Sequence, residues 1–212
     1  MVFARREPRL DRVPRRAVAR CGTEGRGAGV DGLVVEGGGF KNSREVATMV
    51  LLPLICEKLG VPVIAAGGIM DGRSMAAAFA LGAEGIQMGT RMVSAAESPL
   101  HQNWKDMIVK ARETDTVFLN RHGPGPALRA LRTNRTTRLE LEPLADAMGE
   151  LASALDLYFG GDMEASIALS GQVAGRIESI RPVAEILSEA IAEFEAVVAE
   201  LNETYGRTSG AV

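Results

Sequence analysis

The chain has 212 residues, of which 46% are hydrophobic and 24% are charged, so it is long enough for one domain with a sizeable core. Its net charge of -3 provides no basic field for nucleic acid or an anionic membrane. The longest apolar run, 49–56, contains Pro53 and is too short to cross a bilayer, while Cys21 and Cys56 form no CxxC pair. We therefore expect a cytoplasmic protein that acts on a small molecule, without a nucleic-acid, membrane or metal partner.

Residues 1–28 differ in composition from the rest of the chain. Arginines alternate there with Pro8, Pro14 and Gly22, the apolar residues show no periodicity, and no aromatic residue lies among the arginines to stack on a base. We expect residues 1–28 to be a disordered extension and residues 29–212 to form the folded part. The arginines of the extension are Arg5, Arg6, Arg9, Arg12, Arg15, Arg16, Arg20 and Arg26.

From residue 29 onward, short runs rich in β-branched residues alternate with longer helical stretches, which is typical of βα units. Strands are predicted at 32–36, 61–66 and 85–88. Helices are predicted at 43–59, with Ser43 as N-cap, and at 72–81, with Asp71 as N-cap and Gly82 at the end. Because the strands are continuously apolar, they should be buried on both faces and pair in parallel. The predicted class is α/β.

Beyond Arg91 the pattern is less regular. Apolar residues at helical spacing predict a last helix at 182–202, whose apolar stripe we expect to pack against the protein's own core. Before it we expect a helix near 99–112, an extended piece at 116–120, a loop at 122–126, a helix near 144–159 ended by Gly160 and Gly161, and a helix at 163–175.

Two successive predicted strands end in compact turns, Gly67-Gly68 and Gly89-Thr90. Glycine lets the backbone approach an anion closely, with its N–H groups unobstructed, and a following helix N-terminus adds a positive dipole end. Parallel (β/α) barrels often bind phosphate at the loops after two adjacent strands. The Thr90 hydroxyl could add a further donor. The spacing therefore predicts a phosphate site at these turns.

The stretch VPVIAAGGIMDGRSMAAAFALGAEGIQMGTR, residues 61–91, resembles the nitronate monooxygenase family and its flavin-dependent enoyl reductase and quinone reductase relatives. The resemblance extends over roughly 29–201 through VVEGGGF, at 34–40, and SGQVAGRI, at 170–177. It implies a TIM (β/α) barrel that binds FMN. The phosphate contacts it implies are Gly67, Gly68, Gln87, Met88, Gly89 and Thr90, and Glu36, Gly38 and Gly39 would lie along the flavin.

The resemblance implies oxidation of alkyl nitronates by FMN and molecular oxygen. Many members of the family have a histidine that acts as a base or substrate contact after the paired glycines, but here Phe40 follows, and its ring cannot take a proton. The catalytic residue is therefore unknown from the sequence. The alternatives are an NAD(P)H-dependent quinone or enoyl reductase and an inactive fragment of such an enzyme. His101, His122 and Lys41 are weaker candidates for site residues.

A complete barrel has eight strand–helix units in about 250 residues, and only the last units are recognisable here. We therefore expect the C-terminal part of a flavin-binding barrel with trailing helices. In the family the earlier strands cradle the isoalloxazine ring, so retained flavin should be low. Unpaired strands at the barrel edges would also favour self-association.

Overall fold

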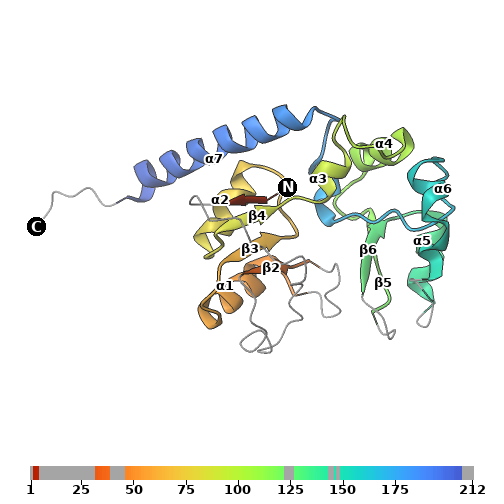
Figure 1. Cartoon of the computed structure of the whole chain (residues 1–212), viewed down its shortest axis with the longest axis horizontal. Helices are drawn as coiled ribbons and strands as arrows, with labels where there is room; N and C mark the ends of the chain where they lie inside the picture. Colours follow the sequence, from red (N-terminus) through yellow and green to blue (C-terminus); the bar gives the residue numbers. More distant parts are fainter. Residues whose placement is uncertain are drawn as a thin grey trace, which may run out of the picture.

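The computed structural model describes residues 2–4, 32–38, 46–121, 127–142, 146 and 149–206. The elements form two groups (Figure 1). One group is a four-stranded sheet with helices α1, α2 and α7, and the other is a two-stranded sheet with helices α4, α5 and α6. Helix α3 lies where the two groups meet.

The larger sheet has the strand order β1-β4-β3-β2. Strands β2, β3 and β4 are parallel, with Glu36 opposite Ala66 and Ala66 opposite Gln87, so their carboxyl ends meet at one edge. The predicted parallel pairing is confirmed. Within the described part of the chain, β2 pairs only with β3. The strands are β1 (Val2–Ala4), β2 (Leu33–Glu36), β3 (Val63–Ala66) and β4 (Gly85–Gln87).

Strand β1 lies in the segment for which we expected no regular structure. It pairs antiparallel with β4, with Val2 opposite Gln87 and Ala4 opposite Gly85. The backbone groups on the outer side of β4 need partners, and an extended apolar tripeptide supplies them. The remainder of 1–28 lies outside the described residues, so its expected disorder stays a prediction.

Helices α1 and α2 follow β2 and β3 as predicted. Helix α1 (Thr48–Lys58) begins later than expected, and its predicted cap, Ser43, lies outside the described residues. Helix α2 (Gly72–Ala80) begins where predicted, because Asp71 accepts a 2.8 Å hydrogen bond from the Ser74 N–H in a capping box. Gly82 ends it with φ of 100°.

Helix α7 (Val183–Tyr205) packs across α2 with its first half only. A Cβ at Gly72 would lie 2.5 Å from the Ala190 carbonyl oxygen, so the two backbones approach closely, and Phe79 meets Phe194 edge to face at 5.4 Å. Beyond that contact the helix projects from the body (Figure 1). Tyr205 is 79% exposed there. The apolar stripe therefore packs against the core over half of its length, not all of it.

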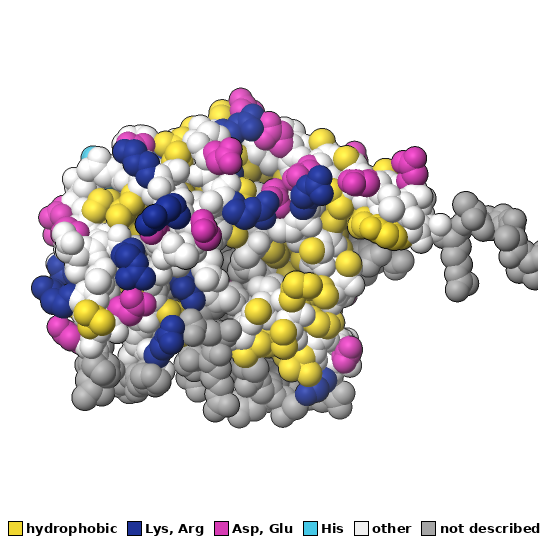
Figure 2. Space-filling model, turned by 180° about the vertical axis from the view of Figure 1, so that it is seen from behind, with side chains coloured by type: hydrophobic (Ala, Val, Ile, Leu, Met, Phe, Trp, Pro, Cys, Tyr) yellow, Lys and Arg dark blue, Asp and Glu magenta, His cyan; other side chains and the backbone are white. Residues whose placement is uncertain are grey.

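Helix α1 also has an exposed apolar face. Leu51, Leu52 and Ile55 are buried, whereas Met49 is 73% and Val50 is 61% exposed. Figure 2 shows exposed hydrophobic side chains gathered on the face opposite to that of Figure 1. Self-association through such surfaces stays a prediction.

In the second group, the predicted extended piece is strand β5, which pairs antiparallel with a strand, β6, that the sequence did not indicate. All four residues of β6 are buried, and one of them is Arg129. The sequence of β6 therefore shows neither the alternation of apolar and polar residues that marks a half-buried strand nor the purely apolar run that marks a fully buried one. Helix α5 was also missed, although Thr133 and Thr136 form a capping box at its start. The predicted loop at 122–126 lies outside the described residues. The elements are α4 (Gln102–Lys110), β5 (Thr116–Leu119), β6 (Leu128–Leu131), α5 (Asn134–Leu141) and α6 (Ala154–Tyr158).

The predicted helix at 163–175 is wrong. Leu169 forms a bridge to Ala130 of β6, and only η4 (Gln172–Arg176), a 3-10 helix, is helical. Ile167 and Ala168 are fully buried in an extended segment, and this burial produced the spacing that resembled a helix. The helix predicted near 144–159 is reduced, within the described residues, to a 3-10 turn (Gly149–Ser153) followed by α6.

Asp71 should make the stability of the protein depend on acid pH. Burial raises the pKa of its carboxyl group, but hydrogen bonds from Ser74 and the charge of Arg176 outweigh burial, so the pKa lies below its ordinary value. Asn keeps the cap but not the charge. We expect Asp71→Asn to lower the free energy of unfolding at pH 7 by up to about 1 kcal/mol.

A carboxyl group with a lowered pKa stabilises the fold above its unfolded pKa of about 4, and this stabilisation is lost as the pH falls through the native pKa. The difference between wild type and Asp71→Asn, measured by urea unfolding, should therefore shrink on going from pH 7 to pH 3. An equal difference at both pH values would contradict this role of Asp71.

Candidate functional site

The turns after β2 and β3 are packed against each other without space between them. Gly67 has φ of 82°, and a Cβ at this position would lie 2.0 Å from the Gly37 carbonyl oxygen. The Thr48 hydroxyl donates a 2.8 Å hydrogen bond to the Gly67 carbonyl, and the Gly37 N–H donates to the Ala66 carbonyl at 3.1 Å. Only glycine fits at position 67, and the two strand ends are held in register.

The next residues along this edge leave their amides open. Gly68 and Gly89 follow the adjacent strands β3 and β4, and both are exposed. Neither amide N–H donates a hydrogen bond to any residue that the structure describes. A Cβ at Gly89 would meet no atom within 4 Å. Two unobstructed donors on neighbouring strand ends are what an oxyanion needs.

Thr90 begins the short helix α3 (Thr90–Val93), and its hydroxyl oxygen accepts a 2.8 Å hydrogen bond from the Gly171 N–H. The hydroxyl hydrogen is still available to a ligand oxygen. The side chain of Met88 is 2% exposed and belongs to the core, so this residue can offer a ligand only its main chain. Gln87 is half-buried at the end of β4. The contact with Gly171 was not anticipated from the sequence.

The N-terminus of α2 does not contribute the expected positive end. Asp71 caps it, and the Gly72 N–H donates a 2.8 Å hydrogen bond to the Glu193 carboxylate of α7. Two carboxylates thus already occupy the end of the helix that follows Gly67 and Gly68. Binding of an anion at these turns would rest on amides rather than on this helix dipole.

A buried arginine, Arg129 of β6, reaches the same edge from the second group of elements. It is 7% exposed, and its Nε donates a 2.9 Å hydrogen bond to the Gly38 carbonyl, while Nη1 donates to the Thr116 hydroxyl at 3.2 Å. Its guanidinium also lies over the Phe118 ring, 5.1 Å from the centroid. Gly38 has φ of 84° and follows β2 closely. In the sequence, the only sign that Arg129 is buried is its position inside the otherwise apolar run LRAL, residues 128–131.

The structure brings Glu36, Gly38, Gly67, Gly68, Gln87, Met88, Gly89 and Thr90 to one edge of the sheet. Gly39, Phe40, Lys41 and His122 lie outside the described residues, so their predicted places stay untested. His101 caps α4, with its Nδ1 accepting a hydrogen bond from the Asn103 N–H at 3.1 Å, which gives it a structural role.

The described residues show neither a metal-binding cluster nor a membrane-spanning helix. They contain no cluster of three His, Cys, Asp or Glu side chains arranged to hold a metal ion. No helix among them is both long enough and apolar enough to cross a membrane.

The model of the family described as "Nitronate monooxygenase" matches residues 17–193. The chain belongs to the nitronate monooxygenase family. The resemblance seen at residues 61–91 is thereby confirmed. Among curated relatives, a "probable nitronate monooxygenase" of Staphylococcus saprophyticus is 48% identical over 75 residues, which are 35% of this chain and 21% of the relative.

Solved structures of similar proteins confirm the predicted fold class, the C-terminal part of a (β/α) barrel. FabK from Thermotoga maritima has 39% sequence identity and a TM-score of 0.77, covering 84% of this chain and 58% of that chain. The nitroalkane oxidase from Streptomyces ansochromogenes has 26% identity and a TM-score of 0.68, covering 82% and 54%. The chain thus spans little more than half of these two structures.

Replacement of Gly67 tests the close contact of the two turns. Gly67→Ala puts a methyl group where the Gly37 carbonyl lies and imposes an unfavourable positive φ, so we expect a loss of at least about 2 kcal/mol in the free energy of unfolding. Gly60→Ala is the matched control, because a Cβ there meets nothing within 4 Å. Urea unfolding measures both variants. Equal stability of the two would show that the turns are not packed as described.

Proposed function

We propose that this chain forms the phosphate-binding part of an FMN-dependent oxidoreductase. The observation that carries the proposal is the pair of open amides, Gly68 and Gly89, on adjacent strand ends. Phosphate oxygens accept hydrogen bonds from such amides, and glycine permits the close approach. Membership in the nitronate monooxygenase family supports FMN as the phosphate-bearing group.

The residues proposed to bind FMN form two sets along the edge of the sheet at which β2, β3 and β4 end. Gly67, Gly68, Gln87, Met88, Gly89 and Thr90 would hold the phosphate, mainly through their main chains, and Glu36, Gly38 and Gly39 would lie along the flavin. The Arg129 guanidinium anchors the Gly38 carbonyl and so positions the turn after β2. When bound, FMN would supply the electron acceptor that no side chain of the protein can provide.

For the substrate, we propose an alkyl nitronate, which FMN would oxidise with molecular oxygen as second substrate. Nitronates are anions, and the buried positive charge of Arg129 lies at the edge where the flavin would be held. The names of the relatives, a probable nitronate monooxygenase and a nitroalkane oxidase, support this chemistry. We propose a cytoplasmic location, with no nucleic-acid or membrane partner.

The second candidate is an NAD(P)H-dependent quinone or enoyl reductase. Phe40 favours it, because a phenyl ring cannot serve as the base that histidine provides in many family members. Oxygen uptake with propyl nitronate distinguishes the first candidate, and NAD(P)H oxidation with a quinone distinguishes the second. FMN binding without either activity would indicate an inactive fragment.

Gly89→Ala tests the phosphate contact directly. The residue has φ of -95°, which alanine adopts, and open space around it, so the free energy of unfolding should change by less than about 0.5 kcal/mol. The methyl group would stand in front of the amide, however, and we expect at least about tenfold weaker binding of added FMN. Quenching of flavin fluorescence measures the affinity. Unchanged affinity in a variant of normal stability would argue against the proposed phosphate site.

A further inference from the structure

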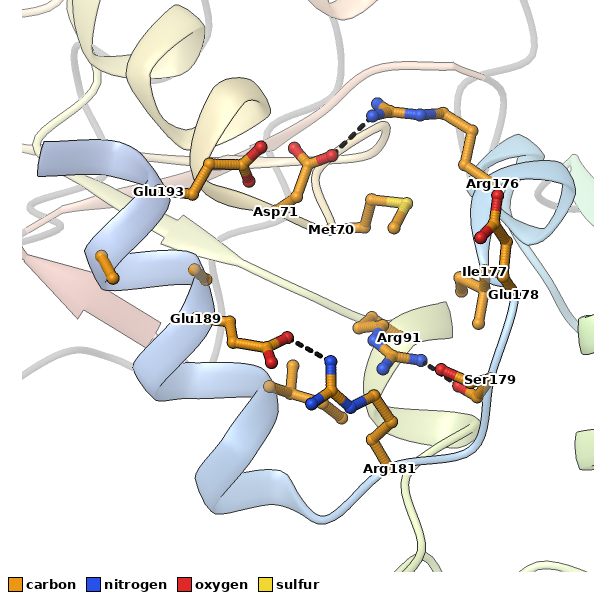
Figure 3. A pocket seen from close by; sticks show the side chains of 13 residues that line it. Met70, Asp71, Arg91, Arg176, Ile177, Glu178, Ser179, Arg181, Glu189 and Glu193 are labelled. Atoms are coloured by element: carbon orange, nitrogen blue, oxygen red, sulfur yellow. Dashed lines mark hydrogen bonds and ion pairs between the residues drawn. The ribbon is translucent and has the colours of Figure 1, made fainter. Parts of the chain in front are cut away.

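A cavity of about 540 Å³ is lined by residues that closely follow the glycine turns in the chain, Met70 and Arg91, and by residues of the C-terminal part. The first half of α7, helix α3, the segment 176–181 and the turn before α2 surround it (Figure 3). Its wall includes the apolar side chains of Met70, Ile177 and Ile186 beside several charged ones. None of the predicted FMN contacts lines it. We call this cavity the Arg91 pocket.

Of the three arginines that line this pocket, Arg91 is the one that has no carboxylate partner among the described residues. It is 7% exposed, and its Nη1 donates hydrogen bonds to the Ser179 carbonyl at 2.8 Å and to the Ser94 hydroxyl at 3.1 Å. Its Nε and Nη2 donate no hydrogen bond to any described residue, and no carboxylate forms an ion pair with it there. Most buried guanidinium groups pair with a carboxylate.

The free donors of Arg91 open into the pocket. Among buried side-chain nitrogen and oxygen atoms of described residues, only Trp104 Nε1 is both sealed from solvent and without a partner. The unpaired Arg91 nitrogens are therefore accessible, although the residue as a whole is buried. Figure 3 shows the guanidinium between the Arg181–Glu189 ion pair and Ser179, to which it donates a hydrogen bond.

Three of the four acidic side chains that line the pocket already have partners. Glu189 binds Arg181, Asp71 binds Arg176 at 2.6 Å, and Glu193 accepts the Gly72 N–H at 2.8 Å. Glu178 lies exposed at the rim. Burial and then the charge of Arg181 lower the pKa of Arg91, and the Glu189 carboxylate offsets this only in part. An additional negative charge between the two arginines would offset both effects.

We propose that the Arg91 pocket binds a small organic anion, with a carboxylate or phosphate group on Arg91 and an apolar body against Met70, Ile177 and Ile186. Guanidinium groups bind both oxyanions through paired N–H donors, and Nε with Nη2 forms such a pair on Arg91. Arg91 itself is largely removed from bulk water, and this burial strengthens a contact with an anion. The proposal does not depend on the function of the glycine turns.

Calorimetric titration of the full chain with hexanoate and with inorganic phosphate tests the proposal. The phosphate titration is repeated on Gly89→Ala, so that phosphate bound at the glycine turns is distinguished from phosphate bound in the Arg91 pocket. Binding of hexanoate alone identifies a carboxylate ligand, and binding of phosphate alone identifies a phosphate ligand. Arg91→Gln should weaken whichever binds by at least about tenfold. If neither anion binds, or Arg91→Gln binds equally well, the proposal is wrong.

Arg91→Gln also removes the hydrogen bond to the Ser179 carbonyl and with it a contact that stabilises the fold, so a second variant keeps the test decisive. Glu189→Gln removes the carboxylate beside Arg91 and leaves Arg181 paired with Glu185 alone, so the affinity for the anion should rise about fivefold. Glu200→Gln removes the same charge from an exposed position of the same helix and is the matched control. Equal affinities of Glu189→Gln and Glu200→Gln would overturn the proposal.

Discussion

The contact of Gly67 with Gly37 is the constraint on which the rest of the site depends. The two turns meet so closely that no side chain fits, and Thr48 fixes the Gly67 carbonyl with a hydrogen bond. Since β2, β3 and β4 are parallel and in register, this contact places three strand ends at one edge. The open amides of Gly68 and Gly89 become neighbours as a result, and without that arrangement neither glycine turn alone would be more than a compact loop.

The second group of elements is tied to this edge by residues that follow one another in the chain. Thr90 accepts the Gly171 N–H, and Arg91 donates to the Ser179 carbonyl, so one short helix holds both ends of the segment 171–179. From the other side, Arg129 of β6 holds the Gly38 carbonyl. A ligand at the glycine turns and one in the Arg91 pocket would therefore contact consecutive residues of α3, Thr90 and Arg91.

The sequence predicted the parts whose signals are local. The cap at Asp71, the helix end at Gly82 and the apolar strands depend on neighbouring residues, and the structure agrees with these predictions. The sequence did not predict the elements whose residues are buried by contacts with distant parts of the chain. Leu169 pairs with Ala130, and Arg129 is buried because Gly38, Thr116 and Phe118 surround it. Likewise, the Gly72–Glu193 bond that caps α2 joins residues far apart in the chain, and no spacing rule reveals it.

The central claim is that the glycine turns hold a phosphate, and the most direct test compares FMN with riboflavin, which differs from FMN only in lacking that group. Both affinities are measured by flavin fluorescence on the same preparation of the wild-type chain. If the amides of Gly68 and Gly89 bind the phosphate, FMN should bind at least about tenfold more tightly than riboflavin. Equal affinities would contradict the account, because they would mean that the phosphate makes no contact with the protein.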